Sequence, residues 1–231
     1  MKYVVGARGS KLSMAQTNWV ISELKKVNSD CEYEIKPITT KGDTDTRPLF
    51  TIEQKGIFEK EIDKAVAAKE IDFAVHSLKD VPSELADNLI IASIPKREKV
   101  NDVFISSDDS SLDKIKPGSV IGTSSLRRAV QISRQRSDVT VKPIRGNIET
   151  RINKASGENY DAIVLAQAGI SRLGVDVNFT PLSVDDFSPS PGQGAIAIVA
   201  RTDDIQTIEM LKKIEDADSR LEIEAERALS D

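Results

Sequence analysis

The residues best suited to chemistry in this sequence gather in the stretch 122–128, GTSSLRR, where a strand pattern gives way to a helix pattern. Ser124 or Ser125 is a natural N-cap for that helix. Arg127 and Arg128 then fall in the first helical turn, where the helix dipole disfavours each cation by about 0.3–1 kcal/mol. Free N–H groups, hydroxyls and two guanidinium groups together favour an anion-binding site. The alternative is a solvated helix start whose arginines pair with nearby acids.

Other arginines also follow strand patterns. In the stretch 143–151, PIRGNIETR, Arg145 leaves a strand, and Asn147 is placed to cap the helix that carries Arg151. The guanidinium positions expected at strand ends, facing one cleft, are Arg8, Arg127 or Arg128, Arg145, Arg151 and Arg172. Such a cluster predicts a polyanionic ligand, and bidentate geometry suits carboxylates and phosphates equally. The sequence lacks a GxxxxGKS/T phosphate loop, so phosphate is the weaker choice.

A carboxylate and a lysine follow a buried strand pattern in the stretch 72–84, DFAVHSLKDVPSE. Asp80, beside Lys79, is expected at the strand end, where it can act as an acid or base or stabilise a developing cation. A plain ion pair of Lys79 and Asp80 in the turn before Pro82 is an equally good interpretation. His76, the only histidine, fits a packed or hydrogen-bonded strand residue better than a catalyst, and one histidine with one cysteine argues against a zinc site.

Composition limits the classes of protein that the chain can represent. Its 231 residues are 39% hydrophobic and 30% charged, which suits two globular domains. A net charge of −5 argues against general nucleic-acid binding, and the basic stretch 127–136 lacks the aromatic residues that would stack on RNA bases. No run of about 18–20 apolar residues and no signal-peptide pattern is present. With one cysteine, Cys31, we expect a cytoplasmic protein without membrane or nucleic-acid partners.

Short strand patterns alternate with helix patterns, which is typical of α/β architecture. Strands are expected at 3–6, 32–39, 72–76, 89–94, 103–106, 120–122, 139–144, 162–166 and 195–200. Helices are expected at 11–27, 57–69, 125–136, 147–155, 167–173, 204–214 and 219–229. The connectors 95–100 and 188–192 predict two crossings between two lobes, with a central cleft. Domain 1 would comprise 1–95 and 194–216, domain 2 would comprise 96–193, and 217–231 would form a terminal helix.

The patterns also predict which faces of three helices are apolar. In the helix at 11–27 the apolar face is expected to hold Leu12, Ala15, Trp19, Val20 and Val27. In the helix at 57–69 it is expected to hold Phe58, Ile62, Ala65 and Val66. In the helix at 125–136 it is expected to hold Leu126, Ala129 and Val130.

Seven motifs, taken in their order and spacing, resemble the porphobilinogen deaminase family. They are TKGD (40–43), KGIFEKE (55–61), AVHSLKDVP (74–82), IGTSSLRR (121–128), RGNIETR (145–151), LAQAGISRLG (165–174) and PGQGA (191–195). The resemblance implies a transferase that joins four porphobilinogen units head to tail, with release of ammonia, to give the linear tetrapyrrole hydroxymethylbilane. It also implies two lobes like those of type-II periplasmic binding proteins, with the family's small third domain absent or vestigial here.

The resemblance implies roles for particular residues. Asp80 resembles the family's catalytic carboxylate, which stabilises the cationic azafulvene left when ammonia departs. The implied anchors for the carboxylates of substrate and cofactor are Arg8, Ser10, Lys79, Ser125, Arg127, Arg128, Arg145, Arg151 and Arg172. Gln16, Thr123 and Gln193 resemble cleft-lining partners. Lys55 and Phe58 resemble residues of a lid, although Glu53 and Gln54 stand where the family commonly has glycines.

The resemblance also implies a dipyrromethane cofactor, attached in the family to a cysteine shortly after the motif that LEIEAERALSD (221–231) resembles. Cys31 lies far from that motif, so we expect the chain as it stands to lack the covalent cofactor and turnover. We expect a monomer whose partners are porphobilinogen and the growing polypyrrole. The alternative function is that of a non-catalytic, two-lobed polycarboxylate-binding protein.

Overall fold

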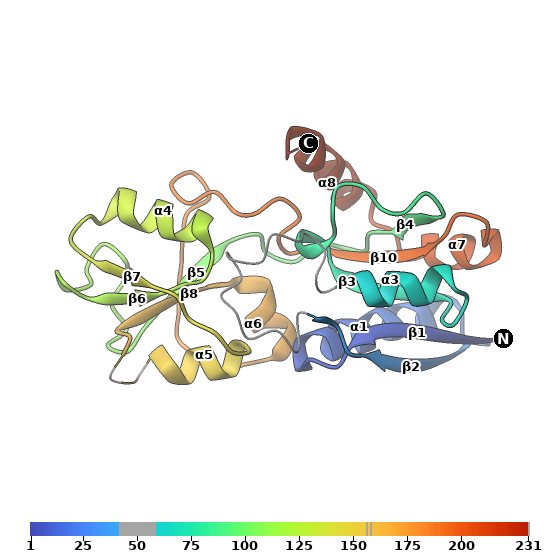
Figure 1. The fold of residues 1–231 in the computed structure, drawn as a ribbon, viewed down its shortest axis with the longest axis horizontal. Coiled ribbons are helices and arrows are strands. Elements are labelled where there is room, and N and C mark those ends of the chain that lie inside the picture. The colour runs from blue at the N-terminus through green and yellow to red at the C-terminus, as the bar shows by residue number, and fades with distance from the viewer. Residues whose placement is uncertain (42–58, 156, 158, 231) are drawn as a thin grey trace. The chain divides into compact units, whose positions relative to one another are not determined.

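A computed structural model describes residues 1–41, 59–155, 157 and 159–230 of the chain, and these residues form two compact units (Figure 1). Unit 1 contains the described residues 1–41, 59–98 and 191–230, and unit 2 contains those from 99 to 190. The chain therefore leaves unit 1 after Glu98 and returns to it at Pro191. Within the described residues, no helix is both long and apolar enough to cross a membrane.

Unit 1 is built on a five-stranded sheet with the order β2-β1-β3-β10-β4. Its strands are β1 (Lys2–Arg8), β2 (Glu32–Ile38), β3 (Phe73–Ser77), β4 (Leu89–Ser93) and β10 (Ile196–Arg201). Strand β1 runs parallel to β2 and β3, whereas β10 is antiparallel to β3 and β4. Because β10 starts with Ile196 opposite Ser77, the end of β3 and the start of β10 lie at the same edge of the sheet.

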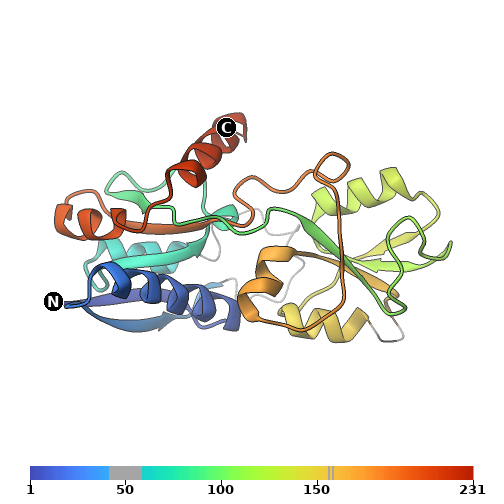
Figure 2. The same cartoon turned by 180° about the vertical axis from the view of Figure 1, so that it is seen from behind.

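Helices cover both faces of this sheet (Figures 1 and 2). Helices α1 (Lys11–Val27) and α7 (Ile205–Lys212) pack on one face, where Leu24 and Leu211 meet Phe73 and Ile198. Helix α3 (Lys60–Ala67) packs on the opposite face through Ile62 and Val66. Helix α8 (Ala217–Ser230) contributes Ile223 to a smaller apolar cluster with Ala197. Side chains therefore alternate between two buried layers along β3 and β10, as a sheet covered on both sides requires.

Unit 2 repeats this plan with the strand order β7-β6-β8-β5-β9. Its strands are β5 (Asp102–Ser106), β6 (Val120–Gly122), β7 (Thr140–Lys142), β8 (Ala162–Ala166) and β9 (Thr180–Pro181). Strand β6 is parallel to β7 and β8, and β5 is antiparallel to β8 and β9. Helix α4 (Leu126–Gln135) covers one face, and α5 (Ile148–Ala155) and α6 (Gln167–Leu173) cover the other.

Most expected elements are present with small shifts at their ends, but two predicted helix faces are wrong. The buried side of α1 is formed by Ser13, Gln16, Thr17, Val20, Ile21 and Leu24, and Val27 is 46% exposed. Polar residues can face the sheet there because they have partners: the Thr17 hydroxyl donates to the Ser13 carbonyl at 2.8 Å. In α4, Leu126 is 73% and Val130 59% exposed, while Arg128 and Ile132 are buried.

Some short elements differ from the sequence-based expectation. Strand β9 and the short 3-10 turn Leu78–Asp80 have no counterpart among the expected elements, because both are too short to show a period. Helix α3 is confirmed over Lys60–Ala67, and its expected face holds for Ile62, Ala65 and Val66. Phe58 lies outside the described residues.

Candidate functional site

In unit 1 the candidate site lies where the parallel strands β1 and β3 end. Strand β3 leads into the turn Leu78–Asp80, in which Leu78 is buried and Lys79 and Asp80 are exposed. Strand β1 ends at Arg8, and Ser10 caps α1 by accepting a hydrogen bond from the Ser13 amide at 3.3 Å. Ligands usually bind beyond the carboxyl ends of parallel strands, and this edge has that character.

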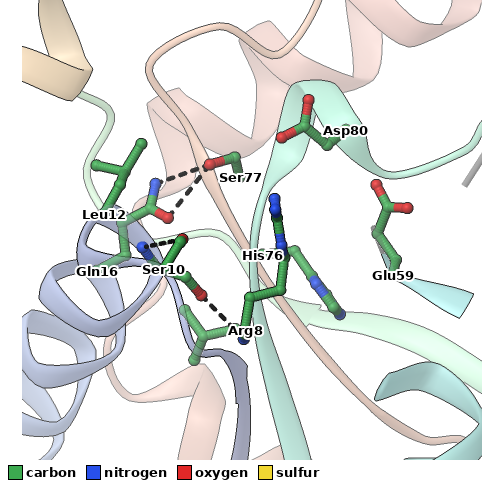
Figure 3. Close-up of a pocket in the computed structure, with 10 residues that line it drawn as sticks. Arg8, Ser10, Leu12, Gln16, Glu59, His76, Ser77 and Asp80 are labelled. Carbon is green, nitrogen blue, oxygen red and sulfur yellow. Dashed lines mark hydrogen bonds between the residues drawn. The ribbon is translucent and has the colours of Figure 1, made fainter. Parts of the chain in front are cut away.

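A pocket at this edge brings together four of the predicted site residues, Arg8, Ser10, Gln16 and Asp80 (Figure 3). The Arg8 side chain extends along the pocket toward Asp80. The Gln16 amide nitrogen lies 2.9 Å from the Ser77 hydroxyl, which fixes one wall. The remaining lining residues are Leu12, Ser13, Glu59, Val75, His76 and Ser77.

His76 lines the pocket and contacts helix α3 through its imidazole ring. Its Nε2 atom lies 3.1 Å from an Asp63 carboxylate oxygen on α3. Both side chains are largely buried, at 4% and 16% exposure. His76 is therefore a packed, hydrogen-bonded strand residue, as its place in an apolar strand pattern predicted.

The segment that leads into β10 borders the Asp80 turn. Gln193 is almost fully buried, and its carbonyl accepts a hydrogen bond from Arg97 Nε at 2.9 Å. The backbone carbonyl of Ala195 accepts from the Leu78 amide at 3.0 Å, which fastens this segment to the start of the turn. Gln193 thus lies at the same sheet edge as Asp80.

In unit 2 the corresponding edge is formed by the ends of β6, β7 and β8. Thr123 is buried directly after β6. Ser124 joins β6 to the segment after β7, because its hydroxyl bonds the Ile144 carbonyl at 2.7 Å and the Ile144 amide at 3.0 Å. Ser125 is the N-cap of α4, with its hydroxyl 3.5 Å from the Arg128 amide. The choice between Ser124 and Ser125 as the cap is therefore resolved in favour of Ser125.

Asp102, at the start of β5, forms ion pairs with two of the predicted arginines, Arg127 and Arg128. Its buried carboxylate lies 2.6 Å from Arg128 Nη2 and 2.7 Å from Arg127 Nη2. Burial by itself would raise the pKa of Asp102, but the charges and hydrogen bonds of Arg128 and Arg127 outweigh it and hold the pKa below its usual value. Arg127 also donates to the Ser188 carbonyl, so it has protein partners of the kind that the alternative interpretation expects.

A second group of guanidinium charges lies beside this pair. The pKa of Arg151 is lowered by burial first, and then by the positive charges of Arg128 and Arg145. Asn147 caps α5 by accepting from the Thr150 amide at 2.8 Å, and Arg151 Nε donates to the Gly146 carbonyl at 2.8 Å. Because arginine stays protonated, the mutual repulsion of Arg128, Arg145 and Arg151 would be relieved by a bound anion.

The other predicted residues fall in three places. Arg172 is half-buried in the last turn of α6, which follows β8 directly. Lys79 is exposed on the Asp80 turn. Lys55 lies outside the described residues, as does Phe58. The single cleft expected for all of these residues stays a prediction.

Sequence reasoning missed several residues that shape these sites. Asp102 is the most important, and its signal was an acidic residue that opens the apolar strand DVFIS. Ser77 and Glu59 line the unit 1 pocket, and Asp63 holds His76 from behind. These roles depend on contacts across 13 to 61 residues of sequence, which no local pattern encodes.

Fold and site together define a two-unit α/β fold of the type-II periplasmic-binding-protein class, with a polar pocket that contains Asp80 in unit 1 and an arginine cluster in unit 2. The substrate-binding domain of a putative molybdenum ABC transporter from Clostridium difficile has this fold, with a TM-score of 0.56 over 96% of both chains. Its sequence identity is 12%, so the likeness concerns the fold alone.

The family follows from the sequence comparisons. Residues 3–209 match the family model "Porphobilinogen deaminase, dipyromethane cofactor binding domain". A probable porphobilinogen deaminase of Nitrosopumilus maritimus is 84% identical over 100% of this chain and 74% of its own length. A porphobilinogen deaminase of Listeria innocua is 48% identical over 98% of this chain and 75% of its own. The chain belongs to the porphobilinogen deaminase family, and dipyrromethane is the cofactor of the matching domain.

Proposed function

We propose that this protein, which we expect not to turn over without its covalent cofactor, joins four porphobilinogen units head to tail to give hydroxymethylbilane when a dipyrromethane primer is supplied, releasing one ammonia for each unit. The observation that carries the proposal is the arginine cluster of unit 2, with Arg128 on α4, Arg145 just before α5 and Arg151 on α5, where burial and then the charges of Arg128 and Arg145 lower the pKa of Arg151. A cluster of that kind calls for a ligand with several negative charges. Each pyrrole unit carries an acetate and a propionate, so the growing chain is such a ligand.

Asp80 is the residue that we assign to the reaction itself. When the aminomethyl C–N bond of porphobilinogen breaks, the pyrrole nitrogen supplies the electron pair, and the departing nitrogen takes up a proton and leaves as ammonia. The pyrrole unit that remains is a cation whose N–H would donate to the Asp80 carboxylate. A fixed negative charge beside that cation lowers the barrier, because its attraction for the pyrrole unit grows as positive charge develops there.

The residues of unit 2 fit the dipyrromethane cofactor by the chemistry of their donors. Its acetate and propionate groups are carboxylates, and guanidinium groups bind carboxylates through two parallel hydrogen bonds. Arg145 and Arg151 would hold such groups, together with the hydroxyl of Thr123 and the N-terminal amides of α4. When bound, the cofactor supplies the primer to which new pyrrole units are joined.

The proposal extends to the state of the protein in the cell. We place the protein in the cytoplasm as a monomer that uses porphobilinogen and the growing polypyrrole as its partners. This is supported by its acidic net charge of −5 and its single cysteine, Cys31, which packs against the core of unit 1.

The test is the rate of uroporphyrin formation from porphobilinogen, with a preformed dipyrromethane primer supplied to every sample. Asp80→Asn keeps the shape of the side chain but removes its charge, and we expect the rate to fall at least about 100-fold. Asp87→Asn, which alters another exposed carboxylate of unit 1, is the matched control and should stay within about twofold.

Two results would contradict the proposal in different ways. Near-normal rates in Asp80→Asn would remove Asp80 from the mechanism. Tight binding of the primer by the unaltered protein, without any consumption of porphobilinogen, would instead identify a non-catalytic polycarboxylate-binding protein.

A further inference from the structure

The C-terminal helix α8 touches the Asp80 turn of unit 1 on several sides. Ile223 of α8 is almost fully buried and packs with Leu78 and Val81, the apolar residues on either side of Lys79 and Asp80. The two polar residues of the turn are thus exposed between two anchored neighbours. The apolar contact with Ile223 therefore holds both flanking residues of the turn against α8.

Arg227 of α8 holds the chain immediately after the turn. Its guanidinium group donates to the carbonyl of Ser83 at 2.6 Å and to that of Pro82 at 2.7 Å, and it lies 3.5 Å from that of Val81. Three consecutive carbonyl groups therefore converge on one side chain. Such a fork-shaped donor restrains the backbone more strongly than single hydrogen bonds from separate residues.

Glu226 of α8 holds the chain on the other side of the turn. Its Oε2 atom accepts from the Gly192 amide at 2.7 Å, and its carboxylate forms a bidentate pair with Arg97 at 2.7 and 2.9 Å. The Arg97 side chain is 6% exposed and that of Glu226 is 33% exposed, so this pair is only partly shielded from water.

Gly192, whose amide donates to Glu226, also packs against the Asp80 turn. It has a φ of +74°, and a Cβ at this position would overlap the Leu78 side chain and lie 3.1 Å from the Lys79 backbone nitrogen. The backbone of Gly192 is therefore packed directly against the turn. Any shift of Gly192 away from Glu226 changes the space available to Leu78 and Lys79.

We infer that α8 is the positioning element for the Asp80 turn, with Glu226 and Arg227 as the positioning residues. The inference rests on the proposed function, because it concerns how the reacting carboxylate is held. A reacting group must be kept within a fraction of an ångström of its productive place, and loss of that restraint lowers the rate without removing substrate binding.

Glu222 provides a matched control within the same helix. It also pairs with Arg97, at 3.0 Å, but its side chain is 59% exposed, and the Gly192 amide donates to Glu226 instead. Glu226→Gln and Glu222→Gln each remove one charge that faces Arg97. Only Glu226→Gln weakens the link to Gly192 as well.

Two measurements on the purified protein test the inference. The first is hydrogen–deuterium exchange of the backbone over residues 77–84, which needs no catalysis. The second is the kcat and KM for porphobilinogen with primer supplied. We expect Glu226→Gln to raise exchange in 77–84 at least about fivefold and to lower kcat about tenfold, with KM within about twofold. Glu222→Gln should change neither by more than about twofold.

The outcomes separate the inference from the proposed function. Unchanged exchange in Glu226→Gln, equal effects of both variants, or faster exchange with an unaltered kcat would each overturn the inference. An unaltered protein that never consumes porphobilinogen would overturn the proposed function, and the role assigned to Glu226 would fall with it. If Glu226→Gln does not fold, Arg227→Gln replaces it, with the same expected exchange and kcat.

Discussion

Units 1 and 2 place a carboxylate at the same kind of sheet edge, yet they use it in opposite ways. In unit 1, Asp80 is exposed on a turn after β3 and lines a pocket. In unit 2, Asp102 is fully buried at the start of β5 between Arg127 and Arg128. The sheets have equivalent strand orders, and in each the fourth strand is antiparallel to its neighbours. Burial and partners, and not the fold, decide whether the acid is available to a ligand.

The largest effect is expected when the two acids are exchanged for amides. Asp102→Asn leaves two guanidinium groups beside an uncharged buried partner, and we expect it to lower the free energy of unfolding by about 3–5 kcal/mol. Asp80→Asn removes an exposed charge and should change it by no more than about 0.5 kcal/mol. Urea unfolding followed by circular dichroism measures both values. Equal losses in the two variants would show that burial does not distinguish the two carboxylates.

The next effect concerns the affinity for carboxylates. Arg151→Gln removes one guanidinium group of the unit 2 cluster, and we expect the Kd for a dipyrromethane bearing acetate and propionate groups to rise about 10- to 100-fold. Isothermal titration calorimetry measures this change. Arg134→Gln alters an exposed arginine of α4 and should leave the Kd within about twofold. A weaker effect of Arg151→Gln than of Arg134→Gln would rule out the cluster as the binding site.

A smaller and matched effect is expected from the helix caps. Ser10 caps α1 and Ser125 caps α4, each after a strand of its unit's sheet. Ser10→Ala and Ser125→Ala should each lower the free energy of unfolding by about 1 kcal/mol, because one amide at the helix start loses its acceptor. Ser133→Ala, on the exposed side of α4, serves as the control and should not destabilise the protein. If only one of the two cap variants lowered the free energy of unfolding, the two units would differ in how their helix starts are stabilised despite their equivalent strand orders.

The smallest effect is a dependence on pH. The pKa of Asp102 is lower in the folded protein than in the unfolded chain, where it is about 3.9. Its ionised form therefore stabilises the fold above about pH 4, and this contribution is lost as the pH falls through the folded value. We expect the stability gap between the unaltered protein and Asp102→Asn to shrink below about pH 4 in acid unfolding experiments. A gap that stays constant down to pH 2 would contradict the assigned ion pairs.

Local signals in the sequence predicted much of the fold. Helices 11–27 and 167–173 and strands 120–122 and 162–166 were expected with the bounds that the structure has. The Asn147 cap was also predicted, because capping joins a side chain to a backbone amide only three residues further along the sequence. The placement of Arg8 and Asp80 at one edge follows from parallel strands that end together.

Long-range contacts account for what the sequence did not predict. The apolar residues Leu126 and Val130 mark the wrong face of α4, because Arg128 turns inward to reach Asp102 and the Val164 carbonyl. The buried side of α1 includes Gln16 because Ser77, 61 residues away, supplies a partner. A period in hydrophobicity cannot register a polar residue that is satisfied by a distant strand.

The position of β10 between β3 and β4 in the unit 1 sheet has a consequence for synthesis on the ribosome. Residues 102–181 contain every strand of the unit 2 sheet in one continuous stretch, whereas β10 inserts between β3 and β4 only after residue 196 has emerged. The middle stretch of the nascent chain can therefore complete its sheet before the unit 1 sheet is complete. Until β10 has been synthesised, the backbone groups of β3 and β4 that pair with it stay without their partners. Chaperones would bind most readily at this stage.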